Sequence, residues 1–352
     1  MAYGLKGDQY NLDYMKTWTD LWNAGRVFKA AFDEQRVAIA GVYGAANDVL
    51  QVPTGTPAEY VVSMEPIPDS FYSLRKNIFS TLFQSMYHLM GCDPQHRLFY
   101  GKLIHLFRIW VTSADNLLDD EDKVVIPIQM PGSSRVMRQV VSIMTADRVF
   151  QRLLAEGIAS GALNAEQARE LADRSLQILL PSAAQEASEE MGIIERPDPE
   201  HVLSVIHRYK TGILFNVAFL APEIIEPHLN RARAVALKEA LMQFGIGCQV
   251  LDDIRDLARD HIERRHNYLL SDLWKNQPEF FQSLEHRELA VTDRLYLEVP
   301  QYTLPAARLG FGMMRDGLAT LGEMGLGIRP KLAEQLADSM FTVLDLRDIQ
   351  YA

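Results

Sequence analysis

The stretch FGIGCQVLDDIRD, residues 244–256, decides the fold of this chain. If it is helical, Asp252 and Asp256 lie one turn apart on the same face, and Asp260 follows one turn later. The residues before them, 241–251, are apolar on most sides, which is typical of a helix buried in a core. We therefore expect an acidic face at the end of a core helix.

A second acidic stretch, DNLLDDED, occupies residues 115–122. Asp115 and Asp119 are also four residues apart, with Asp120 or Asp122 as further support. The apolar run 103–111 precedes them, so this cluster too is expected at the end of a core helix. An isolated acidic helix face is more often simply solvated, and it is this buried context that argues for a site.

Carboxylates four residues apart repel one another unless a cation bridges them. Mg²⁺ suits such pairs because it prefers oxygen ligands and usually completes its shell with water and substrate phosphates. Two such faces opposed across a cavity would form a magnesium site for a phosphate or diphosphate substrate. The expected metal ligands are Asp115, Asp119, Asp120, Asp252, Asp256 and Asp260.

At these residues the chain resembles the trans-polyprenyl diphosphate synthases of the class I isoprenoid synthase superfamily. Residues 244–256 resemble the family's second aspartate motif, 209–215 (YKTGILF) its lysine-threonine motif, and 115–122 its first aspartate motif, with Asn116 where an aspartate is usual. The matches extend from about residue 73 to 270. The resemblance implies an all-α, single-domain helical bundle around a central apolar cavity, with about three Mg²⁺ ions bound.

Length and patterning agree with one helical domain over 1–352, with 1–60 as an N-terminal extension. Long periodic segments without β alternation, at 165–178, 202–220 and 231–251, indicate helices. Residues 124–134 and 195–199 are candidate loops, and Asp198-Pro199-Glu200 is typical of a helix start.

The formal charge of −11 disfavours nucleic acid and anionic membranes as partners. Only Cys92 and Cys248 are present, so a disulfide framework is not expected and a reducing compartment fits. No signal peptide is visible, and the apolar run 212–221 is too short to span a bilayer. We expect a cytoplasmic protein, and the family resemblance implies a homodimer.

The same resemblance implies residues that hold an allylic diphosphate of about ten to twenty carbons and ionise it. Lys210 leads the candidates for the diphosphate clamp, and an aromatic wall would stabilise the carbocation. The bland interpretation is a solvated surface for each basic residue and ordinary core packing for each aromatic one. The candidates beyond the aspartates are Lys210, Arg208, Arg264 and Arg265 for the diphosphate, Phe107, Trp110, Val111 and Phe215 for the hydrocarbon chain, and Thr211 and Gln249 as further substrate-binding residues.

Chain-elongating relatives bind a second diphosphate, that of isopentenyl diphosphate, with an early glycine-lysine-arginine segment and an arginine pair after the first motif. Residues 75–80 align with the early segment and retain Lys76, but Asn77 and Phe79 replace arginines. Residues 123–126, KVVI, hold no arginine pair. His96, Arg97, Arg135 or Arg138 could substitute from shifted positions.

These gaps favour a terpene synthase, which ionises one allylic diphosphate and then cyclises, eliminates or quenches the cation. The alternative is head-to-tail prenyl transfer with a rearranged second site. A catalytically silent regulatory subunit is a weaker hypothesis because both acidic clusters are kept. A di-iron bundle is weaker still, because Glu263 and His266 supply only one Glu-x-x-His pair.

Overall fold

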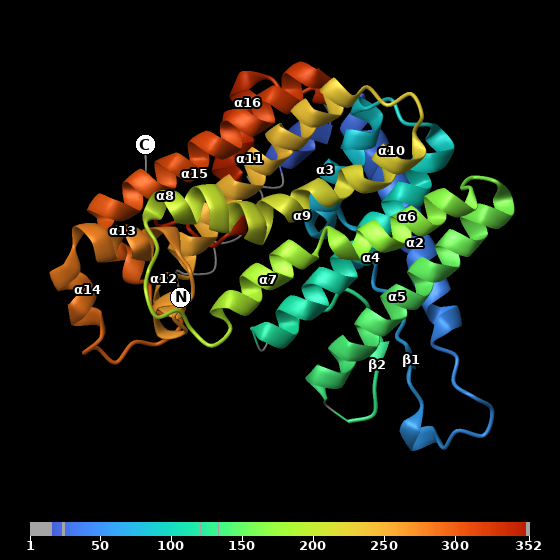
Figure 1. Cartoon of the computed structure of the whole chain (residues 1–352), viewed down its shortest axis with the longest axis horizontal. Coiled ribbons are helices and arrows are strands. Elements are labelled where there is room, and N and C mark those ends of the chain that lie inside the picture. The colour runs from blue at the N-terminus through green and yellow to red at the C-terminus, as the bar shows by residue number, and fades with distance from the viewer. Residues whose placement is uncertain (1–15, 23–24, 120, 133, 350–352) are drawn as a thin grey trace. The chain divides into compact units, whose positions relative to one another are not determined.

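The computed structural model describes residues 16–22, 25–119, 121–132 and 134–349 (Figure 1). Almost every element in this part of the chain is a helix. The two strands, β1 (Ser63–Met64) and β2 (Ile128–Gln129), have two residues each and pair antiparallel. The predicted all-α class is therefore confirmed.

The chain forms two compact units. The first, here called the Asp115 unit, contains Val27–Ser175 and Val217–Asn230. The second, the Asp252 unit, contains the described residues of Met1–Arg26, Leu176–Asn216 and Arg231–Ala352. Each unit carries one of the two acidic stretches. The prediction of one domain and a central apolar cavity stays a prediction.

The Asp115 unit is built on four long helices and several short elements. Helix α2 (Arg26–Val49) lies within the first sixty residues and buries a full face, including Phe28, Phe32 and Ile39. The remaining elements are η1 (Ala58–Tyr60), η2 (Asp69–Tyr72), α3 (Leu74–Leu89), α4 (Pro94–Leu118), α5 (Arg135–Ser160), α6 (Ala165–Gln177), η5 (Val217–Phe219) and α10 (Leu220–Ile225).

Helix α4 delivers the first acidic stretch. It starts cleanly because the Asp93 carboxylate accepts a hydrogen bond from the backbone N–H of Gln95 at 2.8 Å, and Pro94 occupies the first turn. Its apolar run is buried from Leu103 to Phe107, and it packs along α5. The acidic residues thus follow a core helix, as the sequence predicts.

The Asp252 unit is also helical throughout its described residues. Its elements are α7 (Leu180–Glu189), α8 (Pro199–His201), η3 (Val202–Ile206), η4 (Arg208–Gly212), α9 (Ile213–Asn216), α11 (Arg231–Arg255), α12 (Leu257–Ile262), α13 (Tyr268–Asn276), α14 (Pro278–Leu284), η6 (Leu295–Leu297), α15 (Pro300–Leu321), η7 (Gly322–Leu326) and α16 (Pro330–Val343). Asp198 caps α8 by accepting from the Glu200 N–H, so the predicted helix start is confirmed.

Helix α11 is the core helix that the sequence predicts, and it packs along α15 (Figure 1). The two backbones approach closely where Gly247 meets Gly310, since a Cβ on Gly247 would come within 2.7 Å of the Gly310 carbonyl oxygen. By length and composition α11 is also able to cross a membrane, but 67% of its most apolar window is buried inside the protein. Its apolar surface is therefore largely used for packing.

The segment predicted as one helix at 202–220 is helical but irregular. Both η3 and η4 are π-helical, with wider turns than an α-helix, and α9 and the 3₁₀ turn η5 follow. Helical periodicity does not distinguish wide turns from ordinary ones, so the sequence gives no sign of them. π turns occur frequently at functional sites.

Candidate active site

Asp115 and Asp119 keep the helical spacing that the sequence predicts. The Asp119 N–H donates to the Asp115 carbonyl oxygen at 2.8 Å, so the helical bonding of α4 reaches Asp119 at its C-cap. Asp115 is exposed and Asp119 is half-buried. Asp120, also predicted as a ligand, lies outside the described residues.

Asn116, which stands where an aspartate is usual, holds the chain after α4. Its side chain is 3% exposed, donates to the Lys123 carbonyl oxygen and accepts from the Lys123 N–H, both at 3.0 Å. An amide can do both, whereas a carboxylate can only accept. The departure at this position thus has a structural reason, and Asp115 and Asp119 remain as the spaced pair.

Among the side chains that could replace the missing arginines, at least Arg97, His96 and Arg138 contact carboxylates. Arg97 binds the Glu34 carboxylate at 2.9 Å, and His96 contacts Glu226 at 3.0 Å. Arg138 pairs with Asp122 at 2.9 Å. The structure therefore uses these side chains to join elements of the Asp115 unit.

A different arginine reaches the early segment. Arg108, on α4, donates from Nη1 to the Asn77 side-chain oxygen at 2.8 Å. Asn77 is 1% exposed and has non-helical backbone angles inside α3, where its amide also donates to the Phe71 and Ser73 carbonyl oxygens. Sequence reasoning missed Arg108 because it lies within an apolar run. A single charged residue inside such a run was the signal that could have identified it.

The surroundings of Arg108 are polar but not acidic. Burial lowers the pKa of its guanidinium, which the nearby Tyr43 partly offsets. Burial together with the Arg108 charge also lowers the pKa of His105 to about 3, so this imidazole is neutral. Neither ring nitrogen of His105 has a hydrogen-bond partner in the described part of the chain. Nor does any described carboxylate lie within ion-pair distance of Arg108.

Lys76, the retained residue of the early segment, places its ammonium 4.0 Å from the centre of the Phe71 ring. A cation held on an aromatic face remains available to an anion on its other side. Lys76 thus belongs to the early segment, residues 75–80, and Arg108 contacts the same segment through Asn77.

The predicted hydrocarbon-binding residues of α4 pack against α5. The Phe107 and Trp110 rings are 5.3 Å apart, and Trp110 contacts Phe150 at 5.4 Å. The Trp110 indole N–H donates to the Ile143 carbonyl oxygen at 3.3 Å. Phe107 is buried, whereas Trp110 and Val111 are half-buried, so one side of this cluster remains open.

On the Asp252 unit, Asp252 and Asp256 converge on one cation, the Arg255 guanidinium. Arg255 Nη2 lies 2.6 Å from Asp252 Oδ1 and 2.5 Å from Asp256 Oδ2. Burial raises the pKa of Asp252 to about 6, and the Asp256 and Asp253 carboxylates add to this rise while Arg255 opposes it. The predicted pair therefore shares one face and is bridged by a positive charge.

Asp253, between them, is structural. It is 2% exposed and accepts hydrogen bonds from His207 Nε2 at 2.9 Å, the Tyr268 N–H at 2.6 Å and the Gln249 amide at 3.0 Å. Burial opposes its ionisation, but the His207 contact and the other donors hold the pKa of Asp253 below its usual range. This carboxylate anchors α11 to the π-helical segment.

Thr211 and Gln249, both predicted as substrate-binding, contact each other. The Thr211 hydroxyl donates to the Gln249 side-chain oxygen at 2.5 Å, and the Gln249 amide in turn donates to the Asp253 carboxylate at 3.0 Å. The contacts 207–253 and 211–249 show that the segment 207–211 and α11 run antiparallel. The lysine-threonine segment is thus fixed to the helix that carries the second motif.

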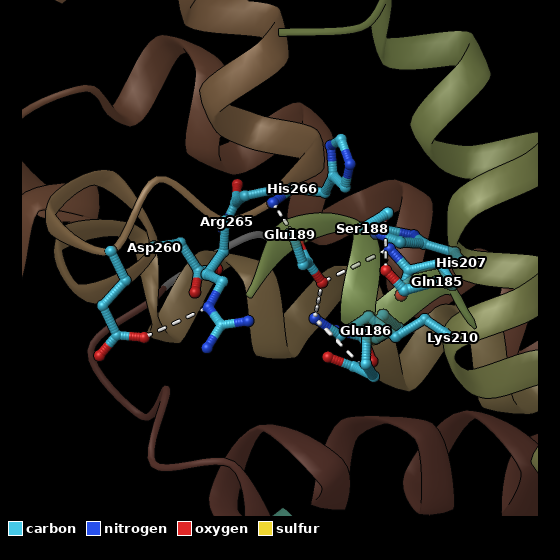
Figure 2. Close-up of polar contacts among 12 residues, drawn as sticks. Gln185, Glu186, Ser188, Glu189, His207, Lys210, Asp260, Arg265 and His266 are labelled. Atoms are coloured by element: carbon cyan, nitrogen blue, oxygen red, sulfur yellow. Dashed lines mark hydrogen bonds and ion pairs between the residues drawn. The ribbon is translucent and has the colours of Figure 1, made fainter. Parts of the chain in front are cut away.

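Lys210 is paired with a carboxylate that sequence reasoning missed (Figure 2). Its ammonium is 2.9 Å from Glu189 and 3.7 Å from Glu186. The Glu189 side chain is fully buried and also accepts the His266 backbone N–H at 2.5 Å. Burial alone would lower the pKa of Lys210, but Glu189 and Glu186 raise it well above its usual range, so Lys210 stays protonated.

The other predicted site residues of this unit differ in how far their side chains are buried. Asp260 accepts from the Asn267 amide at 2.7 Å, and burial, with the charge of Asp253 adding to it, raises its pKa well above the usual range. Arg265 lies 3.6 Å from Glu263. Arg208 and Arg264 are exposed, and Phe215 packs on Gly245 with its ring 6.2 Å from Phe244.

The donor set consists of carboxylates, the kind that binds a divalent cation when phosphate groups supply further ligands. Among the described residues, no group of three or more His, Cys, Asp or Glu side chains is gathered to hold a metal by itself. Mg²⁺ is commonly held by one or two carboxylates together with substrate phosphates. The Arg255 guanidinium already stands as a cation between Asp252 and Asp256, which shows that their oxygens converge on positive charge.

Several solved structures that share this fold are prenyl diphosphate synthases. A decaprenyl diphosphate synthase from Rhodobacter capsulatus aligns over 89% of this chain and 99% of its own, at 15% identity and a TM-score of 0.58. A geranylgeranyl pyrophosphate synthetase from Pyrococcus horikoshii aligns over 90% and 98%, at 15% identity and a TM-score of 0.56.

A heptaprenyl diphosphate synthase from Staphylococcus aureus has a TM-score of 0.58 at 11% identity and aligns over 88% of this chain and 98% of its own. No protein-family model matches the chain, and no curated protein sequence matches it. The alignments cover nearly the whole of each similar structure and most of this chain. The chain therefore has the class I isoprenoid synthase fold, in the form found in trans-polyprenyl diphosphate synthases.

Proposed function

We propose that this protein is a Mg²⁺-dependent prenyltransferase that joins an allylic diphosphate of about ten to twenty carbons to isopentenyl diphosphate. In this reaction the allylic C–O bond breaks and its electron pair leaves with pyrophosphate. The double bond of isopentenyl diphosphate then attacks the allylic cation, and loss of a proton restores a double bond. The observation that carries the choice of prenyl transfer is Arg108.

Arg108 has the properties of a binding residue for a second diphosphate. A half-buried guanidinium without a carboxylate still loses part of its hydration, and such a group persists where a ligand or a network compensates it. Its Asn77 contact orients it toward the early segment, which also carries Lys76. Arginine binds phosphate oxygens in a bidentate way, so Arg108 supplies the charge that Asn77 and Phe79 lack.

We assign the first diphosphate to the acidic pairs and Lys210. Bound Mg²⁺ would neutralise the charge that develops on the leaving diphosphate. Asp115 with Asp119, and Asp252 with Asp256, would hold the metal, while Asp260 lies one turn further along. Lys210, kept protonated by Glu189, has three N–H donors and can serve the diphosphate as well as its carboxylate.

Product analysis tests this function directly. The protein and Mg²⁺ are incubated with geranyl, farnesyl and geranylgeranyl diphosphates, each with and without isopentenyl diphosphate. Prenyl transfer predicts longer diphosphates that form only when isopentenyl diphosphate is present. Hydrocarbons or alcohols formed from the allylic substrate alone would contradict it and establish a terpene synthase.

Replacing Arg108 by glutamine is expected to raise the KM for isopentenyl diphosphate by about tenfold or more, because a charge-assisted contact to phosphate contributes about 1.5–3 kcal/mol. The KM for the allylic substrate should stay within about twofold, since Arg108 does not belong to either aspartate pair. Initial rates with one substrate varied and the other saturating measure both values.

The matched control for this prediction is Arg152→Gln, an exposed arginine on α5 of the same unit. It should leave both KM values unchanged. If Arg108→Gln raised the two KM values equally, or neither of them, Arg108 would not be the residue that binds the second diphosphate.

One observation favours a terpene synthase as the second candidate. The segment after the first motif presents no arginine pair, and its Val125 and Ile126 side chains are 8% and 2% exposed. The Tyr43 hydroxyl holds this segment by donating to the Val125 carbonyl oxygen at 2.7 Å. Lys123 nearby pairs with Glu121. Neutralisation of a second diphosphate would therefore depend on the charges of Arg108 and Lys76.

Several further expectations belong to the same proposal. We expect a cytoplasmic homodimer with one catalytic domain per chain and about three Mg²⁺ ions per site. Both cysteines are buried and free, which suits a reducing compartment. Retention of both acidic pairs favours an active enzyme over a silent regulatory subunit.

A further inference from the structure

Glu189 joins two segments that are far apart in the sequence, although no motif marks it. It is the last residue of α7, and its side chain is fully buried. One carboxylate oxygen, Oε1, lies 2.9 Å from the Lys210 ammonium, and the other, Oε2, accepts the His266 backbone N–H at 2.5 Å. In Figure 2 the carboxylate accordingly lies between Lys210 and the backbone of the loop that follows the second motif.

This place is unfavourable for a negative charge. Burial removes the hydration of the carboxylate, and the C-terminal end of a helix carries partial negative charge that repels it. A buried ion pair is weak evidence for stabilisation, because its attraction must first offset the desolvation of both groups. A carboxylate that is satisfied on both oxygen atoms at such a place rigidifies the groups that it contacts.

The loop after the second motif is held in a strained shape. Arg264 has a φ of 55°, in the left-handed region that residues other than glycine rarely adopt. The Ile193 N–H donates to the Arg264 carbonyl oxygen at 2.8 Å. Arg196 Nη1 donates to the next carbonyl oxygen, that of Arg265, at 2.9 Å. Backbone strain persists only where the surrounding structure imposes it, and it occurs frequently at functional sites.

The turn after α7 brings these two stretches of backbone together. Gly192 has a φ of 79°, and its N–H donates to the Glu189 carbonyl oxygen at 2.9 Å, so the chain reverses directly after the helix. A Cβ on Gly192 would come within 3.0 Å of the Arg264 Cβ. Helix α7 also contacts the lysine segment at its backbone, because the Ser182 hydroxyl donates to the Lys210 carbonyl oxygen at 3.3 Å.

We propose that Glu189 is a positioning residue that fixes the Lys210 ammonium relative to the loop 264–266, so that cations of both segments meet one diphosphate. The proposal rests on the proposed function in one respect, namely that Lys210 binds the leaving diphosphate. It deepens that function because cations placed before the substrate arrives bind it at a lower entropic cost. Glu189 acts only through its partners and does not touch the substrate.

Inorganic pyrophosphate is the probe, because it tests this arrangement without a prenyl chain. Its dissociation constant is measured by equilibrium dialysis with Mg²⁺, for the full-length wild type and for Glu189→Gln. Glutamine keeps the size of the side chain but has one acceptor oxygen and no charge, so it cannot hold Lys210 and His266 as glutamate does. We expect pyrophosphate to bind at least about tenfold more weakly, the order of effect of one charge-assisted hydrogen bond.

Kinetics distinguish positioning from a general loss of structure. In Glu189→Gln the KM for the allylic substrate should rise by a similar factor, whereas the KM for isopentenyl diphosphate should stay within about twofold. The second value should not move because that diphosphate is assigned to Arg108 and Lys76. The matched control is Glu190→Gln, the same change at the exposed neighbouring residue, which should alter neither KM nor pyrophosphate binding.

A second variant moves the loop without changing any charge. Gly192→Ala places a Cβ against Arg264 while Glu189 and Lys210 are kept. It should weaken pyrophosphate binding at least about fivefold, because a small misplacement removes much of the contribution of a binding group. Circular dichroism checks that each variant is folded, and this variant decides the question if Glu189→Gln does not fold.

The outcomes separate this proposal from the proposed function. Unchanged or tighter pyrophosphate binding in a folded Glu189→Gln variant, or unchanged binding in Gly192→Ala, would overturn the positioning role even if the wild type makes longer diphosphates. Weaker binding in both variants, with no prenyl product from any substrate, would support the positioning role and remove the prenyl transfer proposal. Absence of pyrophosphate binding by the wild type would overturn both.

Discussion

Replacing Asp115 or Asp256 by alanine is expected to lower kcat by about a thousandfold or more, with little loss of fold. Each carboxylate belongs to a spaced pair that would hold Mg²⁺ on the leaving diphosphate, and such charge stabilisation contributes several kcal/mol. About 4 kcal/mol corresponds to a thousandfold change in rate. The measurement is pyrophosphate release with an allylic diphosphate and Mg²⁺, beside thermal unfolding of each variant.

Little loss of stability is expected because Asp115 is exposed and, among the described residues, Arg255 is the charged partner of Asp256 at close range. Asp173→Ala, on the exposed surface of α6, serves as the control and should keep the wild-type rate. A folded Asp115→Ala or Asp256→Ala variant that turned over at the wild-type rate would remove the metal-dependent mechanism proposed here.

The second large effect is expected on stability. Replacing Asp253 by alanine should lower the free energy of unfolding of the protein by about 3–5 kcal/mol, because it removes a buried carboxylate that accepts three hydrogen bonds. The loss leaves His207, the Tyr268 N–H and the Gln249 amide without their acceptor. Urea denaturation followed by circular dichroism measures the change.

The neighbouring residue supplies a matched comparison. Asp252→Ala removes the same side chain one position earlier, where it is 35% exposed and faces Arg255 rather than the core. It should cost less than about 1 kcal/mol of stability and yet abolish turnover. If the two variants were equally unstable, the assignment of Asp253 to structure and Asp252 to metal binding would be wrong.

The same carboxylate gives stability a pH dependence. The pKa of Asp253 is lowered in the folded protein, so its contribution is fully present above the unfolded pKa of about 3.9 and is lost as pH falls through the folded value. Wild-type stability should therefore decline on acidification more than that of Asp253→Ala. Unfolding curves at several pH values between neutral and acidic check the sign.

The sequence predicts the fold well because both acidic stretches follow buried apolar helices. The helical spacing of Asp115 with Asp119, and the shared face of Asp252 and Asp256, follow from periodicity alone. Contact between Thr211 and Gln249 is a tertiary fact that periodicity does not give, although the family resemblance placed both in the site. A match to a family motif thus identifies residues of one candidate site that periodicity alone does not connect.

The residues that sequence reasoning missed are those whose role depends on partners far along the chain. Glu189 sits at the end of a short helix with no motif around it, and its role comes from Lys210 and the His266 N–H. Arg108 is a single charge inside an apolar run, and its meaning comes from Asn77, 31 residues earlier. The π-helical turns of η4, which contains Lys210, cannot be recognised from the helical periodicity of the sequence.

The paired contacts between the π-helical segment and α11 have a consequence for the evolution of this sequence. His207 and Asp253 are buried partners, and Thr211 and Gln249 are half-buried partners, so a substitution on one side of either pair favours a compensating substitution on the other. Positions 207 and 253, and positions 211 and 249, should therefore covary among descendants of a common ancestor. If Asp256 binds metal as proposed, its role depends on a ligand and not on a distant side chain, so Asp256 should be inherited unchanged wherever the activity is kept.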